Sequence, residues 1–319
     1  MTADRLPHVA VLSGGLSLER EVSLRSGSRV ADALADRGYP VRRLDVDAEL
    51  VGRLTDGDFD VAFLALHGAV GEDGTIQSIL ELLDLPYTGP DALASTLAWE
   101  KPIAKGLYRR AGLPTPDDVT LSSTAFRDIG ASAAIQRITD AIGLPLVVKP
   151  ATGGSALGIT SAQRVEEIPS AIVSALSYAD AVLIERHVEG TEVAVSVLDG
   201  KPLPAVEIQP KEGAYDFSAR YTAGATEFHV PARLDDDVLA RCADVAVTAY
   251  EAIGARHVSR ADLVVDAEGT AWLLELDTCP GLTETSLLPM AALAAGMDFA
   301  DLVERLLRLA VGDGVDRDG

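Results

Sequence analysis

The stretch SRADLVVDAEGTAWLLELD, residues 259–277, consists of two apolar runs joined by a short polar segment that ends in glycine. This pattern predicts a β-hairpin with its turn at Asp266–Gly269. Opposite residues of a hairpin, and residues two apart on one strand, point to the same face. If Val265 pairs with Thr270, one face of the hairpin carries four charged side chains: Arg260, Asp262, Glu275 and Asp277.

In this register Asp262 lies opposite Leu273 and Arg260 lies opposite Glu275, whereas a shift by one residue would divide the charges between two faces. Three carboxylates beside one arginine suit a hard cation such as Mg²⁺ better than zinc. The alternative is a solvated strand face that carries ordinary surface charges.

The residues around and after the hairpin favour a site. Leu274 and Leu276 are expected to pack into a core on the opposite face. Pro280 and Gly281 then predict a turn at the end of the strand, and exposed backbone amides beside a metal form a natural anion site. A solvated strand face does not account for this turn.

Composition sets the class of protein. A chain of 319 residues predicts two or three domains. The net charge of −22 argues against a nucleic-acid partner. The sequence has no apolar run of membrane-spanning length, so we expect no membrane association and a cytoplasmic protein. Neither the two cysteines, Cys242 and Cys279, nor the five scattered histidines have metal-ligand or redox spacing.

The order of predicted elements indicates an α/β protein. Strands at HVAVLSGG, YPVRRLDV and FDVAFLALHG alternate with helices, which is typical of a parallel sheet with helices on its faces. A hairpin turning at Asp199-Gly200 and helices at about 235–253 and 299–310 follow. Residues 211–231 show no periodicity, and connections of that length are usually functional.

Several further residues are candidates for phosphate or substrate binding, each with an ordinary structural alternative. Lys149 ends an apolar strand before the small-residue loop TGGSALG, which in isolation is equally a tight turn and is not a P-loop. Lys101 and Lys105, at i and i+4 of a helix, would more often be surface lysines. His67 follows a strand in the loop HGAVGEDG, where α/β sheets bind ligands, or it is a capping or core residue.

Eight segments in order resemble the D-alanine–D-alanine ligases of the ATP-grasp superfamily: GGLSLEREVSLRSG, LHGAVGEDGTIQ, YTGPDALASTLAWEKPIAK, VKPATGGSALG, IERHVEGTE, YDFSARY, SRADL and LDTCPGLTETSLLPMAA. The resemblance covers nearly the whole chain. It implies a three-domain ATP-grasp architecture, with an N-terminal parallel α/β domain (1–97), a small central α+β domain (98–183) and a C-terminal α+β domain with an antiparallel sheet (184–319). ATP would lie between the last two domains.

The resemblance also implies the role of each site residue. ATP would be contacted through its phosphates by Lys101 and Lys149 and through its adenine and ribose by Glu185, Arg186, Val188 and Glu192. Two Mg²⁺ ions, with Mn²⁺ as a possible substitute, would be bound by Asp262, Glu275 and Asp277. The first D-alanine would be held by Glu19, which is tied to Ser155 and Tyr221, with His67 as a further substrate residue. The oxyanion would be stabilised by Arg260 and the Gly281 amide, and the second D-alanine would be held by Ser286 and Arg220.

The implied reaction joins two D-alanines through an acyl phosphate, with amino acids as small-molecule partners, for peptidoglycan precursor synthesis. Family members commonly form homodimers. The chain departs from the family pattern at Asp277 (usually Asn), Arg220 (usually Lys), Ala156 (usually Ser), Gly153 (usually acidic) and Glu100 (usually Asp). These departures leave two alternatives: a related ligase for another amino-acid pair, and an inactive nucleotide-binding paralogue.

Overall fold

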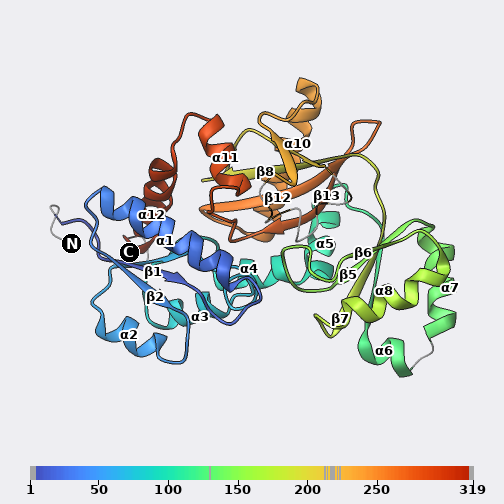
Figure 1. The fold of residues 1–319 in the computed structure, drawn as a ribbon, viewed down its shortest axis with the longest axis horizontal. Helices are drawn as coiled ribbons and strands as arrows, with labels where there is room; N and C mark the ends of the chain where they lie inside the picture. The colour runs from blue at the N-terminus through green and yellow to red at the C-terminus, as the bar shows by residue number, and fades with distance from the viewer. Residues whose placement is uncertain are drawn as a thin grey trace.

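The computed structural model describes residues 5–128, 131–211, 213, 215, 220, 222 and 224–315. Within this part of the chain the strands form three sheets, one parallel and two antiparallel (Figure 1). The parallel sheet lies at one end of the molecule, a four-stranded sheet lies at the other, and the largest sheet lies between them. The predicted mixed α/β architecture is confirmed.

The N-terminal sheet has the strand order β2–β1–β3, with β1 at Val9–Ser13, β2 at Val41–Asp45 and β3 at Val61–Leu64. Every residue of β1 and β3 is buried, as expected for a parallel sheet covered on both faces. The helices that connect or follow these strands are α1 (Arg20–Asp36), α2 (Leu50–Asp56) and α3 (Thr75–Leu82). The parallel sheet predicted from the alternating pattern is therefore present.

The C-terminal end of the chain completes the core of this N-terminal sheet. Helices α11 (Leu287–Ala294) and α12 (Phe299–Val315) bury Leu288, Leu302 and Leu306 in one cluster with residues of β1, β3 and α1. Figure 1 shows α12 lying beside α1, and Arg37 at the end of α1 pairs with Asp301 and Glu304 of α12. The two ends of the sequence therefore fold as one unit.

The four-stranded sheet is antiparallel, with the order β4–β7–β5–β6. Helices α7 and α8 cover it through an apolar cluster that includes Ile138, Ile172 and Val148. Its elements are β4 (Asp118–Ser122), α6 (Ser123–Asp128), α7 (Ala131–Ile142), β5 (Leu146–Pro150), β6 (Thr160–Ala162), a 3₁₀ turn (Val165–Glu167), α8 (Ile168–Ala175) and β7 (Ala181–Arg186).

The largest sheet is antiparallel, with the order β11–β10–β8–β12–β13 and β9 paired to β8. One face packs on α4 (Ala92–Trp99), α5 (Lys101–Arg110) and α10 (Asp236–Ile253). The strands are β8 (Thr191–Leu198), β9 (Lys201–Pro202), β10 (Val206–Pro210), β11 (Thr226–His229), β12 (Val258–Val265) and β13 (Ala271–Asp277). The turn at Asp199-Gly200 is confirmed, whereas β11 lies in a segment for which no element was predicted.

The predicted register of the β12–β13 hairpin is wrong, although its four charges do share a face. Val265 pairs with Ala271 instead of Thr270, which moves the register near the turn by one residue. Leu274 is then an extra residue in a β-bulge, so Asp262 pairs with Glu275 instead of Leu273. Two offsets of one residue restore the common face, and Arg260 lies opposite Asp277 instead of Glu275.

The bulge also changes the expected burial of the two leucines. Leu276 lies in the core cluster under α10, as predicted. Leu274, which was expected beside it, is the unpaired residue of the bulge and is only partly buried. The prediction for Leu274 is therefore wrong.

The predicted domain boundaries stay a prediction, and two elements bear on them. Helix α5 follows the first boundary yet packs against the largest sheet, and β7 spans the second boundary.

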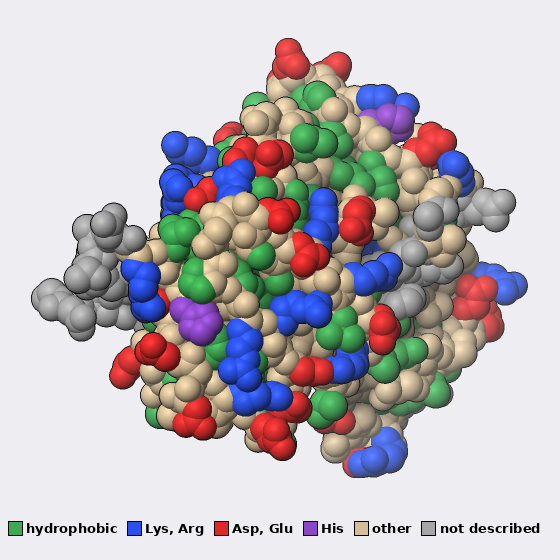
Figure 2. Space-filling model, turned by 60° about the vertical axis from the view of Figure 1, so that its left-hand side comes forward, with side chains coloured by type: hydrophobic (Ala, Val, Ile, Leu, Met, Phe, Trp, Pro, Cys, Tyr) green, Lys and Arg blue, Asp and Glu red, His purple; other side chains and the backbone are tan. Residues whose placement is uncertain are grey.

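Acidic and basic side chains lie next to one another across the face in Figure 2. Among the described helices, none combines the length and apolar character needed to span a bilayer.

Candidate active site

A polar cavity forms where the N-terminal sheet, the loop after β5 and the end of β13 meet. Loops after β1 and β3 provide one wall, the start of α5 provides another, and β13 with the turn after it provides the floor. The predicted site residues that line this cavity are Glu19, His67, Lys101, Ser155, Arg220, Arg260, Glu275, Asp277, Gly281 and Ser286. Residues far apart in sequence thus line one cavity.

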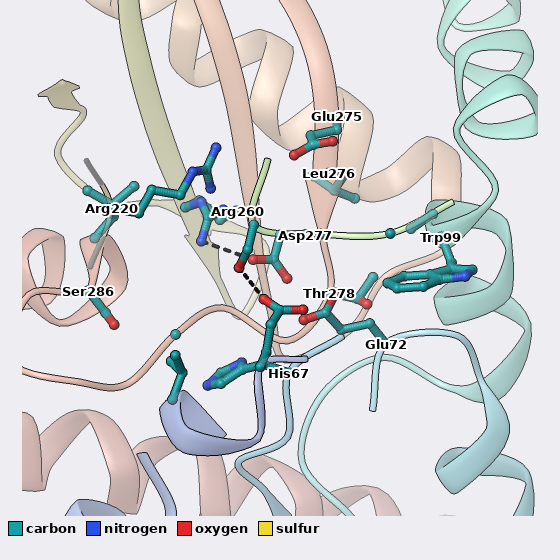
Figure 3. A pocket seen from close by; sticks show the side chains of 18 of the residues that line it. His67, Glu72, Trp99, Arg220, Arg260, Glu275, Leu276, Asp277, Thr278 and Ser286 are labelled. Atoms are coloured by element: carbon teal, nitrogen blue, oxygen red, sulfur yellow. Dashed lines mark hydrogen bonds and ion pairs between the residues drawn. The ribbon is translucent and has the colours of Figure 1, made fainter. Parts of the chain in front are cut away.

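Arg260 is the centre of the charges on the hairpin face. Its Nε lies 2.6 Å from Asp262 Oδ1, and its Nη1 lies 2.9 Å from Asp277 Oδ2. Burial alone would lower the pKa of Arg260, but the two carboxylates outweigh burial and raise it. Burial raises the pKa of Asp277, and Arg260 opposes that rise only in part. Figure 3 shows Arg260 beside Asp277, with Glu275 further along the same strand.

Lys101 supplies the positive charge for the third hairpin carboxylate. Its ammonium lies 3.1 Å from Glu275 and donates a 2.6 Å hydrogen bond to the carbonyl of Gly153. Burial alone would raise the pKa of Glu275, but Lys101 and Lys149 outweigh it and lower the pKa to about 2. Lys101 is the first residue of α5, and Ala104 and Tyr108 of that helix anchor it against the large sheet.

Lys105 is fully buried, so its interpretation as a surface lysine is wrong. Its ammonium lies 2.7 Å from Glu185, whose other oxygen lies 2.6 Å from Lys149. Burial alone would raise the pKa of Glu185, but the two lysines outweigh it and lower the pKa. One carboxylate therefore joins α5, β5 and β7 beneath the loop that follows β5.

Glu19, which precedes the first turn of α1, joins the N-terminal part of the chain to the loop after β5. The Ser155 hydroxyl donates a hydrogen bond to its carboxylate, and burial raises the pKa of Glu19. Glu72, from the loop after β3, also points into the cavity (Figure 3). Burial, together with the negative charges of Asp277 and Glu19, raises the pKa of Glu72 well above the ordinary value. Glu72 lies within the segment LHGAVGEDGTIQ but was not predicted as a site residue.

The remaining predicted residues lie around this cavity rather than on its walls. Arg186 stacks on the Trp272 ring at 4.6 Å, and burial raises the pKa of Glu192 on β8. Arg220, by contrast, does line the cavity and stacks on the Tyr215 ring, also at 4.6 Å. Lys149 lines a smaller adjoining cavity, while Arg186, Val188 and Glu192 line neither. Tyr221 lies outside the described residues.

The turn after β13 faces the cavity. A Cβ on Gly281 would meet the Ser286 hydroxyl at 2.6 Å, so only glycine leaves both groups in place. The Ser286 hydroxyl accepts a 3.0 Å hydrogen bond from the Thr283 amide and lies 2.8 Å from the Thr283 hydroxyl. Ser286 itself precedes α11. The amide of Gly281 and the hydroxyl of Ser286 are therefore held close to each other.

Replacing Gly281 by alanine is expected to lower kcat by about 10²-fold, because the added methyl group displaces the turn from the reacting atoms. The KM for ATP should change less than twofold, since the phosphate-side lysines are untouched. Steady-state kinetics with varied ATP tests this, and Gly52→Ala on α2 is a control at a position where an added Cβ meets nothing within 4 Å and the backbone is not left-handed. Equal activity of Gly281→Ala and wild type would contradict it.

The acidic residues fit a hard cation in their chemistry. Among the described residues no three His, Cys, Asp or Glu side chains converge as a ready metal site. Yet Asp262, Glu275 and Asp277 offer only oxygen donors on one face of the hairpin, which is the donor set that Mg²⁺ prefers. The raised pKa of Asp277 shows that its environment holds less positive charge than a buried carboxylate needs. A bound cation would meet that need.

Comparison with known proteins agrees with this geometry. The family model "D-ala D-ala ligase C-terminus" matches residues 107–308, and "D-ala D-ala ligase N-terminus" matches residues 51–90. A D-alanine–D-alanine ligase of Anaeromyxobacter sp. (strain K) is 44% identical over 299 residues, which cover 94% of this chain and 95% of that protein.

Solved structures give the same result over nearly the whole chain. The D-alanine–D-alanine ligase of Bacillus anthracis superimposes with a TM-score of 0.86 at 31% identity, covering 98% of this chain and 100% of that one. The same enzyme complexed with ATP superimposes with a TM-score of 0.83 at 29% identity, with the same coverage. This chain belongs to the D-alanine–D-alanine ligase family.

Proposed function

We propose that this chain is an ATP-dependent, ADP-forming ligase that joins two D-alanines into D-alanyl-D-alanine for peptidoglycan precursor synthesis. The observation that carries the proposal is the meeting of Glu19, Lys101, Arg260 and Ser286 in one cavity of a family member. A carboxylate for an ammonium, a lysine for phosphate, and an arginine beside a free amide are the groups that this reaction requires.

The first step activates one carboxylate. A carboxylate oxygen of the first D-alanine attacks the γ-phosphorus of ATP, the bond to the β–γ bridging oxygen breaks, and ADP leaves with the electron pair. Glu19 pairs with the ammonium of this amino acid, and Lys101 and Lys149 face the phosphates. Glu185 holds Lys149 in place, so the ammonium needs little reorganisation as charge develops.

The second step forms the peptide bond. The ammonium of the second D-alanine gives one proton to solvent, and the resulting amine attacks the carbonyl carbon of the acyl phosphate; the nitrogen then passes a second proton to the departing phosphate. Arg260 and the Gly281 amide stabilise the tetrahedral oxyanion, the carbon–oxygen bond to phosphate breaks, and inorganic phosphate leaves. Ser286 and Arg220 receive the carboxylate of the second amino acid. The loop around Ser155 covers the cavity through its bond to Glu19, which protects the acyl phosphate from water.

Mg²⁺ is the cation that this site would hold, with Mn²⁺ as a substitute, and Asp262, Glu275 and Asp277 would bind it. Its chemistry when bound is to offset negative charge on the phosphates.

Replacing Asp277 by asparagine, the usual family residue, is expected to raise the Mg²⁺ concentration for half-maximal rate severalfold, because one negative charge is lost while an oxygen donor remains. Maximal rate at saturating Mg²⁺ should stay within about threefold of wild type, because an amide oxygen still coordinates the cation. A Mg²⁺ titration of the rate checks this, with Asp73→Asn, which lies at the start of the α3 region, as control. An unchanged Mg²⁺ dependence would count against Asp277 as a ligand.

A coupled ADP-release assay across D-alanine, L-alanine, D-serine and D-lactate tests the proposed function and its alternatives. A strong preference for D-alanine, with Mg²⁺ required, is the expected result. Preference for another pair would support the related ligase, for which Arg220, Ala156 and Gly153 are the motivating departures. No ADP release with any pair would support the inactive paralogue. A homodimer stays a prediction, which analytical ultracentrifugation tests.

A further inference from the structure

The turn that carries the Gly281 amide is held from outside the cavity by helix α1. Leu282, the next residue, has both of its backbone groups bonded to side chains of that helix. Its N–H donates to the Ser26 hydroxyl at 3.4 Å, and its carbonyl accepts a 2.9 Å hydrogen bond from Arg29. The Leu282 side chain is buried in the cluster shared with α12. Leu282 is therefore fixed at three points.

The other end of the same turn is bonded to His67. A ring N–H of His67 donates to the backbone carbonyl of Cys279, and its Nε2 lies 3.0 Å from the Ser26 hydroxyl. Because a neutral imidazole carries a single N–H, Nε2 accepts the Ser26 proton. Burial lowers the pKa of His67 to about 4, so the ring is neutral near pH 7. His67 and Ser26 thus connect Cys279 to Leu282 across the turn.

These contacts occupy the polar groups of His67 and Ser26 that would otherwise be available to bind a substrate. Both ring nitrogens of His67 are engaged with the protein, and Ser26 is fully buried. The helical spacing of Glu19, Ser26 and Arg29 places all three along one side of α1. The same rigid element therefore carries the proposed ammonium-binding residue at its start and the supports of the turn about two and three turns later. Arg29 is itself fixed by stacking on Phe299, 3.7 Å from the ring centroid.

We propose that Ser26, together with His67 and Arg29, acts as a positioning residue that holds the Gly281 amide toward the acyl carbonyl in the peptide-bond-forming step. His67 acts through Ser26 instead of touching substrate. The inference deepens the proposed function and rests on it. A misplaced amide slows attack on the acyl phosphate but leaves formation of the acyl phosphate intact, because Lys101 and Lys149 belong to α5 and β5 and are held there by Glu275, Gly153 and Glu185.

The experiment compares two rates in Ser26→Ala and Arg29→Met. The first is dipeptide formation. The second is positional isotope exchange in ATP labelled at the β–γ bridging oxygen, which reports reversible acyl-phosphate formation. We expect dipeptide formation to fall about tenfold in each variant while exchange changes less than twofold. The ratio of exchange to turnover then rises about tenfold.

Ser23→Ala is the matched control. Ser23 is also fully buried, one turn earlier on α1, but it bonds to the Gly14 amide and the Ala65 carbonyl, within the N-terminal sheet region. The Ser23→Ala variant should lose about as much stability as Ser26→Ala, while its ratio of isotope exchange to dipeptide formation should equal that of wild type. A merely structural role for Ser26 would lower both rates together, and that result would overturn the inference.

A double-mutant cycle tests the part assigned to His67. If His67 acts through Ser26, Ser26→Ala/His67→Ala loses no more dipeptide formation than the worse single variant. Multiplied losses, or a raised KM for D-alanine in His67→Ala alone, would overturn that part. Absence of dipeptide from wild type would overturn the proposed function first. The positioning role is overturned separately if wild type forms dipeptide and all variants have the same ratio of isotope exchange to dipeptide formation as wild type.

Discussion

Replacing Arg260 by methionine is expected to lower activity by at least about 10³-fold and to destabilise the fold by about 3–5 kcal/mol. Two carboxylates, Asp262 and Asp277, lose their buried partner at 2.6 and 2.9 Å, and the oxyanion loses its arginine. Methionine keeps much of the aliphatic volume, so the loss reflects charge more than packing. Urea unfolding and a coupled ADP-release assay measure the two effects.

Arg241→Met is the control for this variant. Arg241 pairs with Asp237 at 2.8 Å, but both side chains are about half exposed or more. Exposed pairs of this kind contribute about 0–1 kcal/mol. If Arg260→Met had the same free energy of unfolding as Arg241→Met, the prediction would be contradicted, because Asp262 and Asp277 would then not need the charge of Arg260 to remain buried.

Replacing Glu185 by glutamine is expected to cost about 3–5 kcal/mol at pH 7, because two buried ammonium groups lose their common carboxylate. The KM for ATP should also rise, since Lys149 is no longer oriented. Urea unfolding and ATP-dependent kinetics measure both effects. Glu227→Gln, which removes an exposed pair with Lys211 at 3.8 Å, should leave both quantities near wild type.

The stability of this variant should depend on pH with a definite sign. In wild type the pKa of Glu185 is lowered, so its contribution is present above the ordinary carboxyl range and is lost as pH falls through the lowered pKa. In Glu185→Gln the two lysines lose their shared carboxylate and keep only the weaker influence of Asp118 on Lys105 and of Glu275 on Lys149, so burial lowers both pKa values relative to wild type. The unfolded chain then binds more protons than the folded one, so the deficit should shrink between pH 7 and pH 10. A deficit that stays constant over this range would contradict the assignment.

Local patterns predicted individual elements well. The apolar spacing predicted a helix at about 235–253, and α10 spans Asp236–Ile253. The alternation of strands and helices predicted the parallel sheet, because βαβ units have few other solutions. The common face of the hairpin charges was also correct, although the register that led to it was not.

The register was wrong for a reason that a polarity pattern does not contain. The Asp266 carboxylate accepts hydrogen bonds from the amides of Glu268 and Thr270 and from the Trp272 indole. These bonds stabilise a longer turn, in which Asp266 pairs with Thr270 and the strands begin one residue later. Such side-chain bonds depend on the folded turn and leave no trace in apolar periodicity.

Contacts between distant segments were the other source of error. The i, i+4 spacing of Lys101 and Lys105 shows only that they share a helix face. Whether that face is solvated depends on Glu185, 80 residues away, and on the sheet that carries it. The completion of the N-terminal core by α12 likewise joins residues from opposite ends of the sequence. Glu72 was overlooked because its neighbours in space come from other loops.

The β-bulge at Leu274 determines which face of the sheet Glu275 and Asp277 occupy, because Leu274 is one residue more than the pairing with β12 requires. Deleting Leu274 would leave Leu263 opposite Leu273 and Asp262 opposite Glu275, because Leu274 itself pairs with no residue of β12. Glu275 and Asp277 would therefore stay on the cavity face and Leu276 would stay in the core, now in a regular ladder. Straightening β13 with Leu274 retained would have the opposite effect. Glu275 and Asp277 would then share the face of Leu273, which is buried in the apolar layer under α10, and both carboxylates would leave the cavity.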